Sequence, residues 1–181
     1  MSAAGPSQGA NPPPGGQRSD ARRKRGGIAS AAGPSQGANH SFSIRIGEWS
    51  RVAAQLRKVR HDVFVVEQRV PEVLEWDDAD AHSIHALAVD ADGAPIGCAR
   101  LLVDGHIGRV AVVAGWRRSG VGTAVLRALV EEARKRGDAG VIVNAQVAAM
   151  PFYARHGFVA TGDVFDEAGI AHRVMELALG R

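Results

Sequence analysis

A glycine-rich segment that begins with two arginines is the first feature of this sequence that could do chemistry. Residues 117–123 read RRSGVGT and lie between an apolar run at 109–113 and a stretch of helical periodicity that continues to Arg136. Glycines allow backbone N–H groups to turn toward an anion, and a helix N-terminus adds partial positive charge. The segment therefore predicts a phosphate or pyrophosphate site, although a helix start that needs only a tight turn has the same pattern.

Spacing excludes two common phosphate-binding loops. A Walker loop counted from Gly115 and Gly120 requires lysine at the next position, which is Val121. A dinucleotide-binding fingerprint counted from Gly120 and Gly122 requires glycine or alanine where the chain has Val125. Kinases, ATPases and NAD enzymes are therefore disfavoured.

The elements that must position this loop follow from the hydrophobic periodicity of residues 41–181. Alternation predicts a first strand over 41–46, and apolar residues at three- and four-residue spacing predict one helix from Trp49 to Val66. Asp-Gly turns then favour an antiparallel meander. We expect an α/β domain with a single mixed, mostly antiparallel sheet flanked by helices. Its later elements are strands at 83–90, 95–104 and 105–113, a helix from the glycine loop to Arg136, a strand at 141–145, a short helix at 152–156, and strands at 158–164 and 172–179.

Residues 1–40 differ in composition from the rest of the chain. They are rich in Gly, Pro, Ser, Ala and Gln, and they contain the decapeptide SAAGPSQGAN twice. Such a segment has too little apolar surface to offset the entropy lost on ordering. We therefore expect a disordered tail at 1–40 and one folded domain at 41–181. The basic cluster Arg22–Arg25 is either a contact for phosphates or membrane surfaces or a solvated charge run.

The positive net charge belongs to the tail. The chain holds 22 basic and 19 acidic residues, which gives +3, and residues 1–40 hold five basic side chains and one acidic one. The remaining 141 residues therefore net −1. A folded domain without excess positive charge argues against a nucleic-acid partner.

Composition also disfavours membrane, secreted and metal-binding proteins. Apolar runs are far shorter than the roughly 20 residues of a membrane-spanning helix, and residues 1–40 lack the apolar segment of a secretory signal. The single cysteine, Cys98, cannot form an internal disulfide and is expected in the core rather than as an acyl carrier. The seven histidines follow no metal-binding spacing. We expect a cytoplasmic protein with no membrane partner and no metal.

Together with its surroundings, the glycine loop resembles the acyl-CoA motif of the GNAT superfamily of N-acyltransferases. The strand Arg109–Val112 precedes the R-x-x-G-x-G loop, and Asn144-Ala145-Gln146 with PFYARHGF at 151–158 is similar to the second half of the family's motif. The resemblance covers nearly all of residues 42–179 and implies the GNAT fold, in which the fourth and fifth strands splay apart.

A narrower resemblance is to the ElaA/YjcF-like branch of this superfamily. It rests on RHDVFVVEQ at 60–68, on the acidic residues around Trp76, on His85, and on FDEAGIAH at 165–172. The branch implies little about the acceptor substrate.

The superfamily resemblance implies where acetyl-CoA would bind and which group would protonate its thiolate. The pantetheine arm would pair with a strand, the pyrophosphate would lie on N–H groups of the loop, and the N–H of Val112 would stabilise the oxyanion. Tyr153 is the implied general acid, because a phenol with a pKa of about 10 keeps its proton at neutral pH; alternatively it only packs the core. The implied cofactor-binding residues are Val110, Ala111, Val112, Arg117, Arg118, Ser119, Gly120, Val121, Gly122, Thr123, Asn144 and Phe152.

The general base is less determined. Resemblance to the branch suggests Glu67 and His85, but Glu67 alternatively pairs with Arg60 or Arg69, and His85 is alternatively a hydrogen-bonded strand residue. Residues 67–80 contain six acids and one arginine. Three of these acids, Glu75, Asp77 and Asp80, suit attraction of a cationic amine, and the segment equally suits a solvated loop.

These observations predict an enzyme that transfers an acetyl group from acetyl-CoA to a primary amine by direct attack on the thioester. One alternative is a non-catalytic acyl-CoA-binding regulatory module, against which Tyr153 argues. Another is a nucleic-acid-associated protein that binds through its tail, which the charge of the folded domain disfavours. The expected partners are acetyl-CoA and an amine acceptor, with a homodimer left open. Small amines, polyamines, antibiotics and protein amines all stay open as acceptors.

Overall fold

The computed structural model describes residues 41–180 of the chain. Residues 1–40, with the predicted tail, its repeat and the Arg22–Arg25 cluster, lie outside the described residues. Tight turns and helix ends divide the described chain into short elements. They are β1 (Phe42–Glu48), α1 (Trp49–Arg60), η1 (His61–Glu67), α2 (Glu72–Glu75), η2 (Asp78–His82), β2 (Ile84–Asp90), β3 (Pro95–Leu101), β4 (Ile107–Val112), η3 (Ala114–Trp116), α3 (Val121–Arg136), β5 (Gly140–Gln146), η4 (Val147–Ala149), α4 (Met150–Ala154), β6 (Val159–Glu167) and β7 (Ile170–Ala178).

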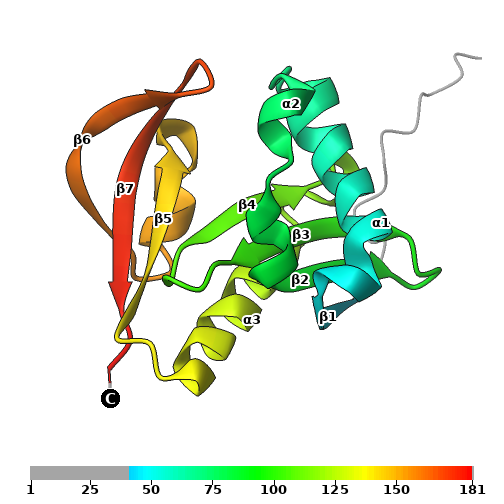
Figure 1. Ribbon diagram of the computed structural model, residues 1–181, viewed down its shortest axis with the longest axis horizontal. Coiled ribbons are helices and arrows are strands. Elements are labelled where there is room, and N and C mark those ends of the chain that lie inside the picture. The colour runs from blue at the N-terminus through cyan, green and yellow to red at the C-terminus, as the bar shows by residue number, and fades with distance from the viewer. Residues whose placement is uncertain (1–40, 181) are drawn as a thin grey trace, which may run out of the picture. The chain divides into compact units, whose positions relative to one another are not determined.

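The strands form two antiparallel sheets that diverge between β4 and β5 (Figure 1). The first has the order β1-β2-β3-β4 and the second the order β5-β7-β6. Within residues 41–180, one isolated parallel bridge links them, from His106 to Ile142. A Cβ on Gly105 would lie 3.1 Å from the carbonyl oxygen of Gly140, so glycine permits this close approach. The predicted α/β class with mostly antiparallel strands is confirmed, and the sheet is divided at the predicted splay.

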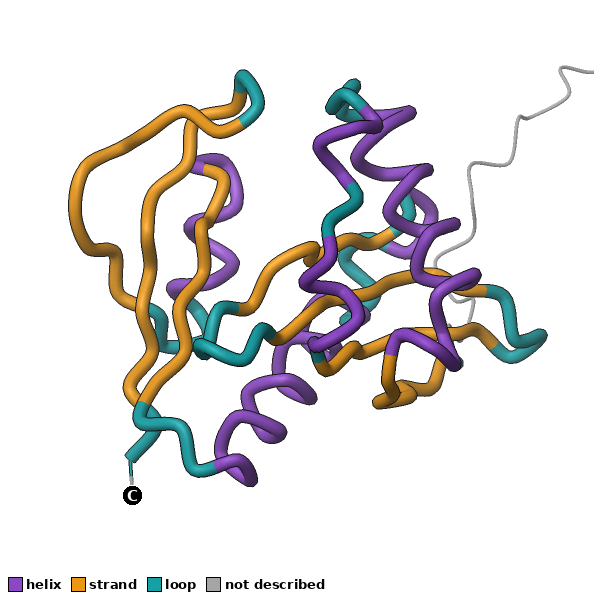
Figure 2. Tube along the Cα trace, in the orientation of Figure 1, coloured by secondary structure: helices purple, strands orange, loops and turns teal. Residues whose placement is uncertain are grey.

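Helices cover both faces of the first sheet (Figure 2). Leu87 and Cys98 pack in a cluster with the buried face of α1, whereas Ala86 and Ala99 pack in a second cluster with α3. Neighbouring residues of a strand point to opposite faces, so this arrangement makes the central strands apolar on both sides. Cys98 is 1% exposed and lies in the core, as predicted.

The first helix differs from its prediction at its C-terminal end. It is α-helical only as far as Arg60 and continues as a π-helix over His61–Glu67. The i→i+5 hydrogen bonds of a π-helix place more residues in each turn, so the face defined by α-helical spacing shifts around the axis. Val63 stays buried, but Val66, predicted on the apolar face, is 61% exposed. That prediction is wrong, and the wider turn places Phe64 at the cavity described below.

The C-terminal strands form one longer hairpin than the sequence suggests. β6 continues to Glu167 and pairs with β7 as far as the turn at Ala168-Gly169, where both residues have positive φ. The register shifts between Thr161 and Val164, so the hairpin bends. Its turn reaches the same cavity as η1.

Candidate active site

A cavity of about 570 Å³ lies where the two sheets diverge. Its lining comes from both sheets. One side, here called the arginine wall, consists of Arg100 on β3 and Arg109 on β4. The other side, here called the polar wall, consists of Asn144 on β5, Tyr153 on α4 and His172 on β7. The splay expected to admit a strand-like ligand thus leads into a space lined by charged and proton-carrying groups.

Tyr153 both packs in the core and lines the cavity, so the two hypotheses for this residue are compatible. Its ring makes edge-to-face contacts with Phe152 and Phe158, at centroid distances of 5.0 and 5.7 Å. Among residues 41–180 its hydroxyl has no hydrogen-bond partner. Burial raises the pKa of Tyr153 to about 12. The phenol is therefore neutral at pH 7 and has a proton to donate to a group in the cavity.

The glycine loop has the backbone geometry of an anion site. Gly120 has φ +94° and precedes α3, a helix of 16 residues whose N-terminus is capped by no described side chain. The first N–H groups of a helix lack intrahelical partners, and the helix dipole makes them attractive to anions. A Cβ on Gly122 would lie 3.6 Å from the ring of Phe152, so the loop and α4 pack closely. Arg118, with φ +63°, is exposed beside these groups.

The side chains of the loop are less available than its backbone. The guanidinium of Arg117 donates to the two carboxylate oxygens of Glu67 at 2.8 and 2.5 Å, and its Nε donates to the carbonyl oxygen of Val112 at 3.1 Å. The Ser119 hydroxyl donates to the carbonyl oxygen of Trp116, and the Thr123 hydroxyl is hydrogen-bonded to Nε2 of His156 at 3.1 Å. Since Glu67 neutralises Arg117, the expectation that this side chain adds charge at a phosphate loses support.

β4 has a free edge beside the cavity. β3 pairs with one side of β4, and within the described residues the only bridge to β5 is at His106. Of the predicted cofactor residues on this strand, Val110 lines the cavity, Ala111 is buried and Val112 is half-buried. An extended ligand could therefore add to β4 as another strand would.

His85 does not lie where a base would be needed. It is 1% exposed on β2, its Nε2 donates to the carbonyl oxygen of Asp80 at 2.9 Å, and its ring centroid lies 5.4 Å from that of Trp49. Burial lowers the pKa of His85. It is absent from the lining of the described cavity. This geometry argues against a catalytic role for His85 and fits the alternative of a hydrogen-bonded strand histidine.

Glu67 is exposed but occupied. Its partner is Arg117, not Arg60 or Arg69 as the alternative supposed. The hydrogen bond from Arg117 lowers the pKa of the Glu67 carboxyl, which makes it a weaker base. Nor does it belong to the residues that line the cavity. The geometry therefore argues against Glu67 as the base.

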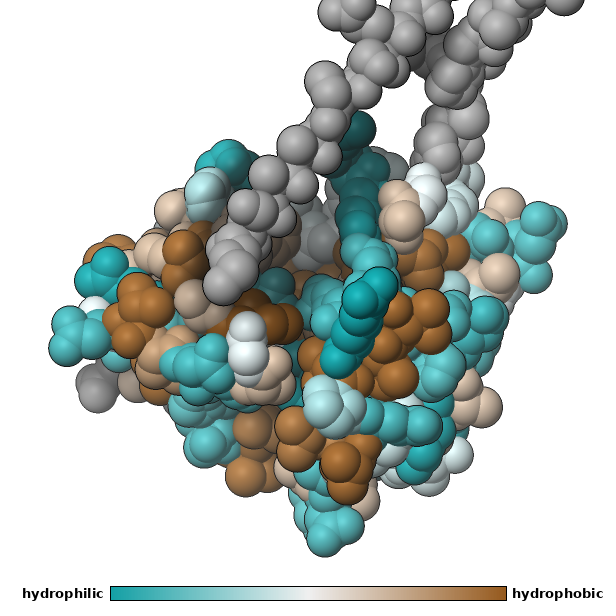
Figure 3. All heavy atoms as spheres, turned by 90° about the horizontal axis from the view of Figure 1, so that it is seen from above, coloured by the Kyte–Doolittle hydropathy of each residue, from teal (hydrophilic) through white to brown (hydrophobic). Residues whose placement is uncertain are grey.

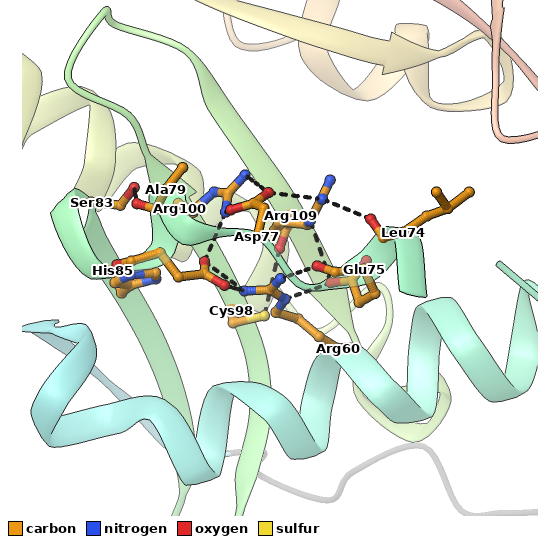
Figure 4. Close-up of polar contacts among 11 residues, drawn as sticks. Arg60, Leu74, Glu75, Asp77, Ala79, Ser83, His85, Cys98, Arg100 and Arg109 are labelled. Carbon is orange, nitrogen blue, oxygen red and sulfur yellow. Dashed lines mark hydrogen bonds and ion pairs between the residues drawn. The ribbon is translucent and has the colours of Figure 1, made fainter. Parts of the chain in front are cut away.

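Two arginines from outside the acidic segment pair with its buried and partly buried carboxylates (Figure 4). Arg60 on α1 donates from Nε to Glu75 at 2.5 Å and from Nη1 to both carboxylate oxygens of Asp80 at 2.8 and 2.9 Å. Arg100 donates from Nη1 to Asp77 at 2.6 Å and to Asp80 at 2.8 Å. These three carboxylates are thus partners of the protein's own arginines. Neither attraction of a cationic amine nor a solvated loop describes them.

Burial and charge act in opposite directions on these carboxyl groups. Burial raises the pKa of Glu75, and the charges of Arg109 and Arg60 only partly offset this. Partial burial also acts to raise the pKa of Asp77, but the hydrogen bonds and charge of Arg100 outweigh it and the net shift is downward. The two neighbouring carboxyl groups therefore have pKa values shifted in opposite directions.

Sequence analysis did not single out Arg109. Between Cys98 and Arg100 the register of β3 against β4 shifts by one residue, so β4 contains a bulge. Arg109 lies in it with φ +53°, a conformation rare for residues other than glycine. The bulge interrupts the alternation of the strand and places Arg109 on the cavity wall. Gly108 is the local sign of it, because glycine inside a strand often marks a bulge.

His172 entered the sequence analysis only as part of a motif. It is 9% exposed, lines the cavity and stacks on Phe165 with a centroid distance of 6.0 Å. Its Nδ1 lies 2.7 Å from the carbonyl oxygen of Ile170. A carbonyl only accepts hydrogen bonds, so Nδ1 carries the proton and Nε2 of the neutral ring keeps a lone pair. The polar wall thus holds a proton acceptor as well as the proton donor Tyr153.

Two further kinds of site were sought in the described part of the chain. Residues 41–180 contain no group of acidic, histidine and cysteine side chains arranged to hold a metal, and no helix of the length and apolarity needed to cross a bilayer.

Seen from above (Figure 3), apolar side chains lie in separate clusters among hydrophilic ones on this face.

Comparison with known proteins agrees with the fold. Residues 52–179 match the family model described as "Acetyltransferase (GNAT) domain". The uncharacterized N-acetyltransferase YjcF of Bacillus subtilis (strain 168) is 39% identical over 121 residues, which cover 65% of this chain and 86% of YjcF. The chain therefore belongs to the GNAT acetyltransferase family.

Solved structures show the same relationship. The crystal structure of Escherichia coli ElaA matches with a TM-score of 0.67 and 28% identity, covering 75% of this chain and 99% of ElaA. An acyl-CoA N-acyltransferase from Pseudomonas aeruginosa matches with a TM-score of 0.68 and 32% identity, covering 76% of this chain and 100% of that one. The resemblance to the ElaA/YjcF-like branch is confirmed by YjcF and ElaA.

Proposed function

We propose that this protein transfers an acetyl group from acetyl-CoA to a primary amine by direct attack on the thioester. The observation that carries the proposal is the neutral Tyr153 at a cavity beside the free edge of β4. A thioester bound along that edge would have a proton donor near its leaving sulfur. Family membership supports acyl transfer, and the acetyl group and the acceptor belong to the proposal.

Acetyl-CoA would be held mainly by backbone groups. Its pantetheine arm would pair with Val110, Ala111 and Val112 on β4. Its pyrophosphate would accept hydrogen bonds from the N–H groups of residues 118–123 at the start of α3, with Arg118 nearby. Asn144 and Phe152 would contact the cofactor from the other sheet and from α4. Backbone donors suit this task because their positions are fixed by the fold before the ligand arrives.

The reaction needs an oxyanion donor, a proton acceptor and a proton donor. The amine nitrogen attacks the carbonyl carbon, and the oxygen gains negative charge that the N–H of Val112 would stabilise. The C–S bond then breaks, and the CoA thiolate takes the proton of Tyr153. The proton lost by the amine would go to Nε2 of His172, either directly or through water. Replacement of His172 by asparagine should then lower kcat, and an unchanged kcat would remove His172 from the mechanism.

A non-catalytic acyl-CoA-binding module is the alternative function. It would need the same loop and the same free edge of β4. It would not need a tyrosine at the cavity, and the position of Tyr153 favours the enzyme.

A screen of acetyl-CoA consumption against small amines, polyamines, aminoglycosides and peptides tests the proposal. The expected result is release of free CoA together with an acetylated amine identified by its mass. Propionyl-CoA and longer acyl-CoAs run in parallel test the preference for acetyl. Tight binding of acetyl-CoA without acetylation of any amine in the panel would favour the regulatory module.

A further inference from the structure

The arginine wall contains hydrogen-bond donors that the protein itself does not use. Arg100 has a side chain that is 7% exposed, and its buried Nε has no partner in residues 41–180. The buried Nε of Arg109 likewise lacks a hydrogen-bond partner there. Buried polar groups nearly always have partners, so such donors call for an explanation. Both arginines line the cavity, where a bound molecule would meet the outer Nη atoms of Arg109, because the Nε atoms themselves are buried.

Arg109 is held more loosely than the other two arginines of the network. Its Nε lies 3.4 Å from Glu75 Oε1, a distance that allows attraction between charges without a well-directed hydrogen bond. Its Nη2 lies 3.3 Å from Asp77 and 3.4 Å from the carbonyl oxygen of Leu74. By contrast, Arg60 contacts its carboxylates at 2.5 to 2.9 Å. The guanidinium of Arg109 therefore has capacity left for an anion.

The carboxylates near Arg109 are already engaged by other arginines. Asp80 accepts hydrogen bonds from both Arg60 and Arg100, and Asp77 accepts two from Arg100. Glu75 accepts a short hydrogen bond from Arg60, at 2.5 Å. Arg109 is thus the cation of the network with the least satisfied charge, and 23% of its side chain is exposed.

The strained backbone at Arg109 adds an independent observation. A positive φ in a residue other than glycine is unfavourable and persists where the surrounding structure imposes it, often at ligand sites. Arg109 lies in the bulge of β4 and lines the cavity. In Figure 4, Arg109 rises from its strand beside Arg100 and ends above the network.

We propose that the arginine wall binds a carboxylate of the acceptor, so that the substrate is a small amine that also carries a carboxylate, such as an amino acid. This inference rests on the proposed function and refines it. The guanidinium fork of Arg109 matches a carboxylate in bidentate geometry. With the carboxylate at the arginine wall, the amino group would extend toward the polar wall, where Tyr153 and His172 lie. The acidic composition of residues 67–80 would suggest the opposite, a polycationic acceptor.

The test compares amino acids with their matched carboxamides. The substrates are glycine, β-alanine, γ-aminobutyrate, δ-aminovalerate and the common L-amino acids, each assayed beside its amide. The first four differ in the spacing from carboxylate to amine, so the series also measures which spacing the site prefers. The kcat/KM of the amino acid should exceed that of its amide by about tenfold, the ratio that corresponds to about 1.4 kcal/mol of interaction with the carboxylate. Equal values for acids and amides would overturn the inference while leaving acetyl transfer intact.

Substitution of Arg109 then assigns the effect to this side chain. Arg109→Gln should raise the KM for the best amino acid by about tenfold or more and leave the KM for its amide and the Kd for acetyl-CoA unchanged. Arg109→Lys keeps the charge but loses the fork, and should fall between. Arg51→Gln, an exposed arginine of α1, is the matched control. Equal losses on acid and amide in Arg109→Gln would contradict the proposed contact.

A binding measurement separates this inference from the proposed function. Calorimetric titration of the amino acid into the protein saturated with CoA reports the carboxylate site without turnover. Binding that weakens in Arg109→Gln, with no acetylation of any amine, would retain the site and reject the enzyme. Acetylation of amines without any carboxylate-dependent binding would retain the enzyme and reject the site. Failure of Arg109→Gln to fold would move the comparison to Arg109→Lys and to the acid and amide pairs on the unchanged protein.

Discussion

The two walls of the cavity are built in different ways. On the arginine wall, Arg100 is fixed by short hydrogen bonds to Asp77 and Asp80, and the ion pairs behind it are almost fully buried. On the polar wall, Tyr153 is neutral and has no described hydrogen-bond partner, and His172 uses only one of its ring nitrogens. Fixed charges suit the orientation of a substrate, whereas groups free to exchange protons suit its conversion. Under the proposed function, binding of the acceptor would belong to the wall on the first sheet, and proton transfer to the wall formed by the second sheet and α4.

The largest effect is expected from the ion pairs behind the arginine wall. Arg60→Met would leave Glu75 and Asp80 buried beside one partner fewer, and breaking a buried pair lowers the free energy of unfolding by about 3 to 5 kcal/mol. Urea denaturation measures this. On the polar wall, Asn144→Leu should change stability by less than about 1 kcal/mol, because its hydrogen bond to Glu167 is long, at 3.4 Å. Similar losses in both variants would remove the contrast between the walls.

Tyr153→Phe should have the next largest effect, and in kinetics rather than stability. The ring and its contacts with Phe152 and Phe158 remain, but the proton donor is lost, so kcat should fall by about 10²-fold. The affinity for acetyl-CoA should stay nearly constant. Steady-state kinetics with calorimetric titration of acetyl-CoA separates the two. An effect confined to acetyl-CoA binding would make Tyr153 a contact residue only.

In the proposed function, the glycine loop at residues 117–123 holds the cofactor between the two walls. Gly122→Val should weaken binding of CoA by about tenfold, since the branched side chain would crowd Phe152 and screen the N–H groups at the start of α3. Gly115→Val is the matched control, because a Cβ on Gly115 would meet nothing within 4 Å. Calorimetric titration of CoA into both folded variants measures the difference. Equal affinities would refute the pyrophosphate site.

Sequence patterns that act over a few residues predicted the structure well. Gly120 and Gly137 delimit α3 and both have positive φ, and the Asp-Gly turns at Gly93 and Gly105 join the strands of the meander. Such signals depend on local backbone preferences that a residue has in any fold. The family motif likewise supplied the predictions for the glycine loop and Tyr153, through two short segments at 109–123 and 144–158.

Features that depend on distant parts of the chain were not predictable in this way. The acidic segment was ambiguous until Arg60 and Arg100 were seen beside it, 15 to 20 residues away along the chain. The bulge at Arg109 depends on the register against β3, and the π-helix that exposes Val66 depends on how η1 packs. Composition counts charges without showing which partners neutralise them. The sequence therefore did not predict Arg100 or Arg109 as cavity residues, whereas it did name Tyr153 and Asn144.

The smallest effect concerns His85, which lies behind the arginine wall and was one of the two predicted candidate bases. Its pKa is lowered by burial, so below its ordinary value of about 6.5 the unfolded chain binds a proton that the folded protein resists. Protonation therefore favours unfolding, and stability falls as the pH drops from about 7.5 toward 5.5. His85→Asn should show a smaller drop in melting temperature over this interval, because asparagine can donate to the Asp80 carbonyl oxygen without titrating. Arg51→Gln provides the baseline for the other titratable groups, which are the same in all variants. A pH dependence in His85→Asn equal to that baseline would show that His85 takes up its proton over the same pH range in the folded and unfolded states, and the sensitivity would then belong to other titratable groups.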